Sequence, residues 1–339
     1  MEELDINKLT PIEIKKLGFP YPKFSQKHLK LFQDLINLDV EEIIDGNTII
    51  KTTNYASIAT VFFPHIWEAK VTGCKSPVEA FRDVRLLGKA IDMAKQYEGK
   101  ATLSAIRSKL MIVSGTQCVS NFRPEVAKLI YNRYGNRGAV FDFSMGYGGR
   151  LVGFLASDCR EYVGTDVNTR NYPCYHEMLH HLPSHDKKIR LFRCPSENFH
   201  PNSTALEYDG KAFQTKPLKQ YKEYFDLAFS SPPYYRNEIY SDDPDQSCIK
   251  YQTYRSWLFS YLLMTIRNCI ELVKPDGKII INIADTKIGG KAYPLENDTL
   301  LICKMEGLKL KETLWMNMTK TMGHGKGWRK EPIFIFQKT

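Results

Sequence analysis

Two consecutive prolines followed by two tyrosines form a stretch of the sequence that could position groups for catalysis. Residues 229–237 read FSSPPYYRN and overlap the end of an apolar run, FDLAFS, at 225–230. Proline cannot donate to a sheet and disfavours helical geometry in the residue before it, so the chain leaves a strand here in an extended, rigid form. Such a turn can hold a hydroxyl oxygen and an aromatic ring at fixed positions beside a reacting atom.

A glycine-rich turn lies upstream, in VFDFSMGYGGRLVGF at 140–154. Gly146 and Gly148 let the backbone approach a ligand closely, while the helix that follows points its N-terminal amides at it. Asp166 ends the next predicted strand, where a carboxylate can accept hydrogen bonds from two ribose hydroxyls. The pattern indicates a nucleoside site; a plain tight turn and a helix N-cap are the structural alternatives.

A third polar group occurs in CPSENF, where Ser196, Glu197 and Asn198 follow another predicted strand. The carboxyl ends of parallel strands meet at one edge of a sheet, so these side chains are expected near the glycine turn. There they can reach the amino group of an adenine. The alternative is an ordinary loop.

Short β-rich runs alternate with helical stretches from about residue 119 onward, which is typical of a parallel sheet with crossover helices. We therefore predict an α/β, Rossmann-like sheet. The seven expected strands are 138–143, 161–166, 189–194, 225–230, 277–284, 308–316 and 332–338. Helices are expected at 123–134, 148–157 and 254–273, and the aromatic residues of the last are assigned to the core.

Residues 1–118 differ from the rest, because 24–38, 76–99 and 101–113 are helical in pattern without intervening strands. We predict a mostly helical accessory region at 1–118, which could recognise a target sequence, and a catalytic domain at 119–339.

The order of these motifs resembles the amino-group DNA methyltransferases, which use S-adenosylmethionine and carry an (S/D/N)-P-P-(Y/F) loop. NFRPEVAKLIYNRYGNRGAVFDFSMGYGGR, SSPPYY and the closing RKEPIFIFQK carry the resemblance, which covers about residues 119–339. Two departures occur: Phe143 and Ser144 stand where the family usually has Pro and Phe, and Gly149 stands where a small hydroxyl residue is common.

The resemblance implies a seven-stranded methyltransferase domain and assigns roles to two sets of residues. The implied catalytic residues are Ser231, Pro232, Pro233 and Tyr234. The implied cofactor-binding residues are Phe122, Pro124, Asp142, Ser144, Gly146, Gly148, Asp166, Ser196 and Glu197. The reaction it implies is methyl transfer from S-adenosylmethionine to an exocyclic base amine of double-stranded DNA, with the base flipped out of the duplex, as in restriction-modification systems.

Serine at the first position of the loop favours N4 of cytosine, and N6 of adenine remains the alternative. Methylation at carbon 5 of cytosine needs a Pro-Cys pair in the same loop, but Pro173-Cys174 follows the second predicted strand of this domain. The same fold would also suit RNA or protein methylation, or a non-catalytic nucleic-acid-binding protein.

A formal net charge of +9 and a pI near 9.0 favour a polyanionic partner. The segment at 317–331 is glycine-rich and basic, and we predict that Lys320, Lys326, Arg329 and Lys330 contact DNA phosphates. The eight cysteines show neither C-x-x-C spacing nor partnering histidines, so no metal is expected. With no apolar run of membrane-spanning length and no signal-peptide pattern, we expect a cytoplasmic protein.

Overall fold

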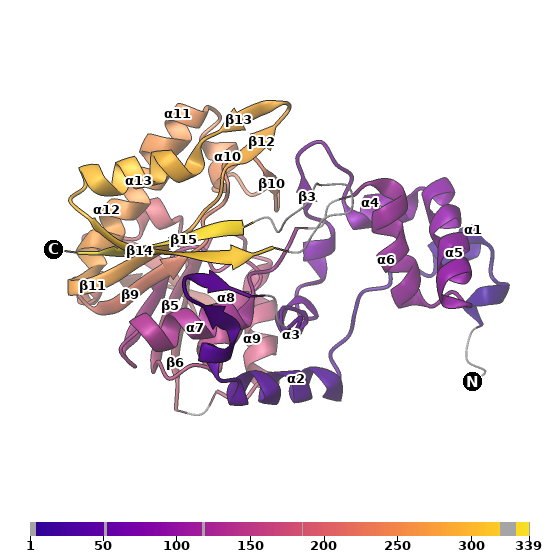
Figure 1. Ribbon diagram of the computed structural model, residues 1–339, viewed down its shortest axis with the longest axis horizontal. Coiled ribbons are helices and arrows are strands. Elements are labelled where there is room, and N and C mark those ends of the chain that lie inside the picture. The colour runs from indigo at the N-terminus through magenta and orange to yellow at the C-terminus, as the bar shows by residue number, and fades with distance from the viewer. Residues whose placement is uncertain (1–4, 51–52, 117–118, 185, 319–329, 339) are drawn as a thin grey trace.

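The computed structural model describes residues 5–50, 53–116, 119–184, 186–318 and 330–338. Within these residues one mixed sheet of 11 strands runs through the molecule (Figure 1). Its strands, in spatial order, are β1 (Ile44–Asp45), β2 (Thr48–Ile49), β14 (Lys309–Asn317), β15 (Lys330–Gln337), β11 (Val273–Asn282), β9 (Phe225–Ser230), β4 (Ala139–Asp142), β5 (Glu161–Asp166), β6 (Lys188–Arg193), β7 (Thr204–Tyr208) and β8 (Phe213–Pro217).

The predicted α/β, Rossmann-like fold is confirmed. All seven predicted strands are present, as β4, β5, β6, β9, β11, β14 and β15. Strands β11, β9, β4, β5 and β6 are parallel to their neighbours in this order, and β15 is antiparallel to β11 and β14. The prediction missed the β7–β8 hairpin, which extends one edge, and the short strands β1 and β2, which extend the other.

Alternate residues of the central strands enter two separate cores. Val140, Leu227 and Ile280 face one core, whereas their chain neighbours face the other. The first core is covered by α2 (Gln26–Asn37), α3 (Ser57–Thr60), α7 (Pro124–Tyr134), α8 (Gly149–Leu155) and α9 (Asn171–His181). The second is covered mainly by α12 (Leu263–Leu272) and α13 (Leu295–Met305). Because both faces are buried, the strands read as nearly continuous apolar runs.

The N-terminal region contributes to two parts of the molecule. Helices α1 (Pro11–Lys16), α4 (Pro77–Arg82), α5 (Val84–Glu98) and α6 (Leu103–Ser114) enclose a third core and form a lobe beside the sheet (Figure 1). Helices α2 and α3 instead pack into the first core, and β2 pairs with β14. The boundary at residue 118 stays a prediction, but residues on its N-terminal side are integral to the sheet's core.

The predicted helix at 254–273 is interrupted. It consists of α11 (Tyr254–Ser256), a π-helical turn η6 (Trp257–Leu262) and α12. The helix of residues 76–99 is also divided, because Asp83 adopts extended geometry and caps α5. No helix among the described residues is both long and apolar enough to cross a membrane.

Candidate active site

A cleft with a volume of about 1650 Å³ opens at the carboxyl ends of the central strands. The helical lobe contributes Arg107 and Met111 of α6 to its wall. The cleft brings together ten of the predicted site residues: Phe122, Ser144, Gly146, Asp166, Ser196, Glu197, Ser231, Pro232, Pro233 and Tyr234. Parallel strands place the loops that follow them along one edge, which explains why motifs far apart in the sequence share this wall.

The two glycines of the turn have different roles. Both have positive φ, 57° at Gly146 and 76° at Gly148. A Cβ on Gly146 would find only Ser144 O, 3.9 Å away, so the backbone there is open to a ligand. A Cβ on Gly148 would come within 3.1 Å of Phe63 and Met178, so this glycine is needed for backbone geometry and packing. Gly148 is not among the residues that line the cleft.

Asp166 is half-buried at the end of β5 and is held by protein donors. Its Oδ2 accepts from the Gly146 amide at 2.8 Å, and its Oδ1 accepts from the Asn168 amide at 2.8 Å and from Asn171 Nδ2 at 3.2 Å. A carboxylate has about four lone-pair sites, so these contacts leave room for about one ribose hydroxyl, whereas hydrogen bonds from two were predicted. The open backbone at Gly146 and the acceptor at Asp166 fit the nucleoside part of S-adenosylmethionine.

Cofactor affinity should fall as the pH drops through about 6. Burial raises the pKa of Asp166 to about 6. Below that value the carboxyl is protonated, and a neutral carboxyl group is a weaker acceptor for a ribose hydroxyl than a carboxylate, so binding weakens. Calorimetry of S-adenosylmethionine binding between pH 5 and pH 8 checks this, with Asp166→Asn as the variant in which the pH dependence disappears.

Asp166→Ala should bind the cofactor about tenfold more weakly, and unchanged affinity would remove Asp166 from the site.

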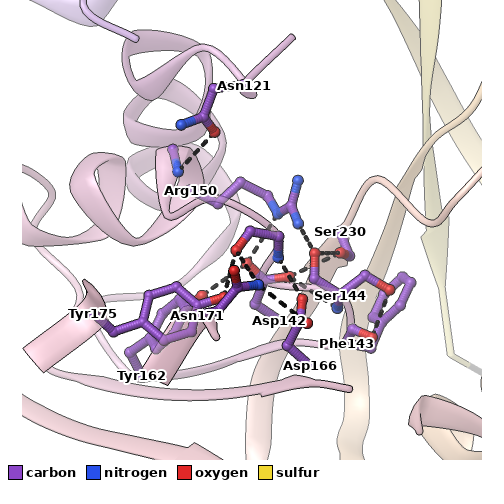
Figure 2. A network of polar contacts seen from close by, with 12 residues as sticks. Asn121, Asp142, Phe143, Ser144, Arg150, Tyr162, Asp166, Asn171, Tyr175 and Ser230 are labelled. Atoms are coloured by element: carbon purple, nitrogen blue, oxygen red, sulfur yellow. Dashed lines mark hydrogen bonds and ion pairs between the residues drawn. The ribbon is translucent and has the colours of Figure 1, made fainter. Parts of the chain in front are cut away.

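Asp142 does not line the cleft. It lies within a network of polar contacts that also includes Ser144, Arg150, Tyr162 and Ser230 (Figure 2). Its carboxylate is fully buried and accepts from Arg150 Nε at 2.9 Å, Tyr162 Oη at 2.7 Å and Ser230 Oγ at 2.8 Å. Arg150 also donates to the carbonyl oxygen of Ser144. The predicted cofactor residue Asp142 is thus placed as the centre of a buried network, which fixes the glycine turn relative to the end of β9.

The Ser-Pro-Pro-Tyr turn follows directly from that anchored end of β9. Ser231 Oγ donates to Tyr234 Oη at 3.4 Å, and Tyr234 Oη donates to Asn282 Oδ1 at 3.2 Å. Tyr235 turns the other way: its φ is 54°, its side chain is buried, and its hydroxyl donates to the Gln252 carbonyl at 2.9 Å. Of the two tyrosines, only Tyr234 lines the cleft.

The two residues predicted to face the adenine, Ser196 and Glu197, are each held by hydrogen bonds. Ser196 shares a hydrogen bond of 3.0 Å with Thr265, and Glu197 Oε1 accepts from Lys250 Nζ at 2.9 Å and from Tyr251 Oη at 3.0 Å. Both residues lie in the short helix η4 (Ser196–Asn198) and are buried against the cleft.

The remaining predicted residues lie elsewhere. Phe122 lines the cleft, and its ring lies 5.3 Å from the Arg150 guanidinium; Pro124 is buried at the start of α7 and does not line it. Lys330 is exposed at the start of β15, with its Nζ donating to Thr48 Oγ1 at 3.3 Å. Lys320, Lys326 and Arg329 lie outside the described residues.

Sequence reasoning missed several cleft residues near the turn. Asn282 ends an apolar strand and lines the same cleft as Asp166. A polar residue at the carboxyl end of a predicted strand was the signal for Asp166, and the same signal could have identified Asn282. Glu238 and Glu331 add two carboxylates; burial raises the pKa of Glu238 to about 7. Tyr261 reaches the cleft from the π-helical turn, at 3.4 Å from Ser144 Oγ, and no sequence pattern signals that turn.

Residues 225–339 match the family model for a DNA methylase. This segment contains the Ser-Pro-Pro-Tyr turn, Asn282 and Glu331. The match supports a methyltransferase that uses S-adenosylmethionine as its methyl donor. No curated protein is significantly similar to the chain in sequence.

Similar solved structures have low sequence identity. TrmN from Thermus thermophilus is 13% identical with a TM-score of 0.40, and the match covers 64% of this chain and 49% of that one. A SAM-dependent methyltransferase from Aquifex aeolicus is 13% identical with a TM-score of 0.39, covering 64% and 90% of the two chains. The chain therefore spans about half the length of TrmN.

Proposed function

We propose that the protein transfers a methyl group from S-adenosylmethionine to an exocyclic amine of a DNA base, with N4 of cytosine as the favoured target. The observation that carries the proposal is the shared cleft. Ser231 and Tyr234 line the same cavity as Gly146 and Asp166, so a base amine and a nucleoside cofactor can meet within it. The family match over the segment that contains the turn supports the same reaction.

The turn suits the chemistry of an aromatic amine. The lone pair of such an amine is delocalised into the ring, which makes the nitrogen a poor nucleophile. Ser231 Oγ and the Pro232 carbonyl can accept its hydrogens and draw the nitrogen toward tetrahedral geometry. When bound, S-adenosylmethionine supplies a methyl group on a positively charged sulfur. The residues that would hold it are Gly146, Asp166 and Glu197, which line the cleft.

The ring of Tyr234 lines the cleft, and its proposed role is to stack on a base that has left the duplex. An enzyme cannot reach the amine inside stacked DNA, so the base must be flipped. The bond from Tyr234 Oη to Asn282 restrains the ring from its far end, while the prolines restrain its backbone. This gives the rigid aromatic of the Ser-Pro-Pro-Tyr turn a role as a base clamp.

Nucleoside mass spectrometry tests the proposal and its alternatives. DNA and RNA from cells that express the full chain should be digested beside those from cells that express Ser231→Ala. We expect N4-methylcytosine in DNA from the wild-type culture, and much less of it in DNA from the Ser231→Ala culture. N6-methyladenine in DNA would support the adenine alternative, and a methylated base only in RNA would move the substrate to RNA. No methylated nucleoside in either would favour a non-catalytic nucleic-acid-binding protein.

DNA binding should depend steeply on salt, because lysine and arginine side chains release counterions when they neutralise phosphates. The triple variant Lys326→Ala, Lys330→Ala, Arg329→Ala should have a shallower slope of log K against log salt, by about one unit for each phosphate that the variant no longer neutralises. Fluorescence anisotropy with labelled duplex measures this slope. The matched control replaces three other exposed lysines, Lys211, Lys219 and Lys222, by alanine. These lysines flank β8, the strand at the edge of the sheet away from β14 and β15. Equal slopes in the two triple variants would place the DNA surface elsewhere.

A further inference from the structure

A buried chain of hydrogen bonds links the N-terminal region to the cofactor side of the cleft. His65 lies in the short helix η3 (Pro64–Trp67) and is only 3% exposed. Its Nε2 lies 2.6 Å from Asn171 Oδ1, and the two residues are 106 positions apart in the sequence. Asn171 is the first residue of α9 and is 2% exposed.

Asn171 in turn holds both groups that face the nucleoside. Its Nδ2 donates to the Gly146 carbonyl at 3.1 Å. It also donates to Asp166 Oδ1 at 3.2 Å (Figure 2). Because a carbonyl oxygen can only accept, the amide nitrogen must face Gly146, and the amide oxygen must face His65. His65 therefore donates through Nε2–H. Burial lowers the pKa of His65, which favours the neutral ring.

The neighbours of His65 pack against the same loop. Phe63 is fully buried, and its ring lies 5.9 Å from the ring of Tyr147. Tyr147 is the residue between Gly146 and Gly148. The rings of His65 and Tyr147 lie 5.6 Å apart. A Cβ on Gly148 would come within 3.1 Å of the Phe63 ring, so Phe63 packs directly against this glycine. The residues around His65 thus form one wall of the glycine turn.

The same N-terminal segment continues to the catalytic side. Strand β3 (Lys70–Val71) pairs with β10 (Glu238–Ile239), and the Thr72 amide donates to the Asn237 carbonyl at 2.9 Å. Residues 63–72 thus bridge the glycine turn and the loop that follows Ser-Pro-Pro-Tyr. His65, Asn171 and the glycine turn lie outside residues 225–339, to which the family match is confined.

We propose that His65 is a positioning residue for the cofactor, which acts through Asn171 to hold the Gly146 carbonyl and the Asp166 carboxylate in their binding geometry. The inference rests on the proposed function, because it takes Asp166 and Gly146 as the nucleoside site. Without the His65 donor, Asn171 Oδ1 loses its buried partner, and the amide can rotate away from both groups.

The experiment compares cofactor binding in full-length variants. His65→Leu removes the donor, whereas His65→Gln returns an amide N–H at a similar reach. We expect His65→Leu to weaken binding of S-adenosylmethionine about tenfold in calorimetry, and His65→Gln to recover most of the loss. The KM for DNA and the kcat at saturating cofactor should stay near the wild-type values. Starting from Asn171→Ala, adding His65→Leu should cause little further loss, because the two residues act in series.

The control is His181→Ala, because His181 lies at the opposite end of α9 from Asn171 and its ring packs against Phe24 and Phe62 of the N-terminal region, with centroids 4.7 and 5.8 Å away. It should keep wild-type cofactor affinity. If His65→Leu does not fold, His65→Asn, whose amide is too short to reach Asn171, replaces it. Wild-type affinity in the donor-free variant, or equal losses with His65→Gln and His65→Leu, would overturn the inference alone. Failure of the wild-type protein to bind S-adenosylmethionine would overturn the proposed function and this inference with it.

Discussion

Ser231→Ala should lower the methyl-transfer rate about 100-fold and leave cofactor affinity unchanged, since loss of one group that stabilises developing charge has effects of this order. Its side chain contacts Tyr234 Oη at 3.4 Å, and Tyr234 keeps its bond to Asn282. The substitution therefore removes an acceptor for the amine without leaving a buried partner unpaired. Single-turnover assays with labelled S-adenosylmethionine measure the rate, and calorimetry measures the affinity.

Tyr234→Ala provides the contrast for this prediction. Removing the Tyr234 ring should weaken binding of the flipped base, whereas removing the Ser231 hydroxyl should affect the amine that is methylated. Stacking on an aromatic ring contributes roughly 1–3 kcal/mol per base, so the variant should hold the flipped base poorly. The fluorescence of 2-aminopurine at the target position should fall in Tyr234→Ala and persist in Ser231→Ala, with Tyr234→Phe as the control that keeps the ring. A full single-turnover rate in Ser231→Ala would make the turn a scaffold and refute this chemistry.

Arg150→Met should lower the free energy of unfolding by about 3–5 kcal/mol, the usual effect of removing one partner of a buried ion pair. Arg150 is 4% exposed and Asp142 is 0% exposed, so the substitution leaves an uncompensated carboxylate inside the protein. Chemical denaturation followed by circular dichroism measures the change.

The double variant Arg150→Met, Asp142→Leu tests the cause of that loss. It removes both charges together and should recover part of the stability. A loss below about 1 kcal/mol in Arg150→Met would show that the pair contributes little to the fold. Cofactor binding should also weaken in the single variant, since Arg150 holds the Ser144 carbonyl beside the glycine turn.

Local patterns in the sequence were enough to predict the central strands, the glycine turn and the Ser-Pro-Pro-Tyr turn. These features depend on local chemistry: β-rich apolar runs, positive φ at Gly146 and Gly148, and the restraint of two adjacent prolines. The meeting of Asp166, Glu197 and Tyr234 in one cleft also followed, because parallel strands end at one edge.

Which polar groups face the cleft, and which are enclosed within the protein, depends on tertiary packing and could not be predicted from the sequence. Asp142 ends a strand as Asp166 does, but Arg150 lies on the next helix and Tyr162 on the next strand, and together they enclose its carboxylate. The contact between His65 and Asn171 joins residues 106 positions apart across separate elements. Local pattern cannot specify such pairs, because they depend on how helices and loops pack on the finished sheet.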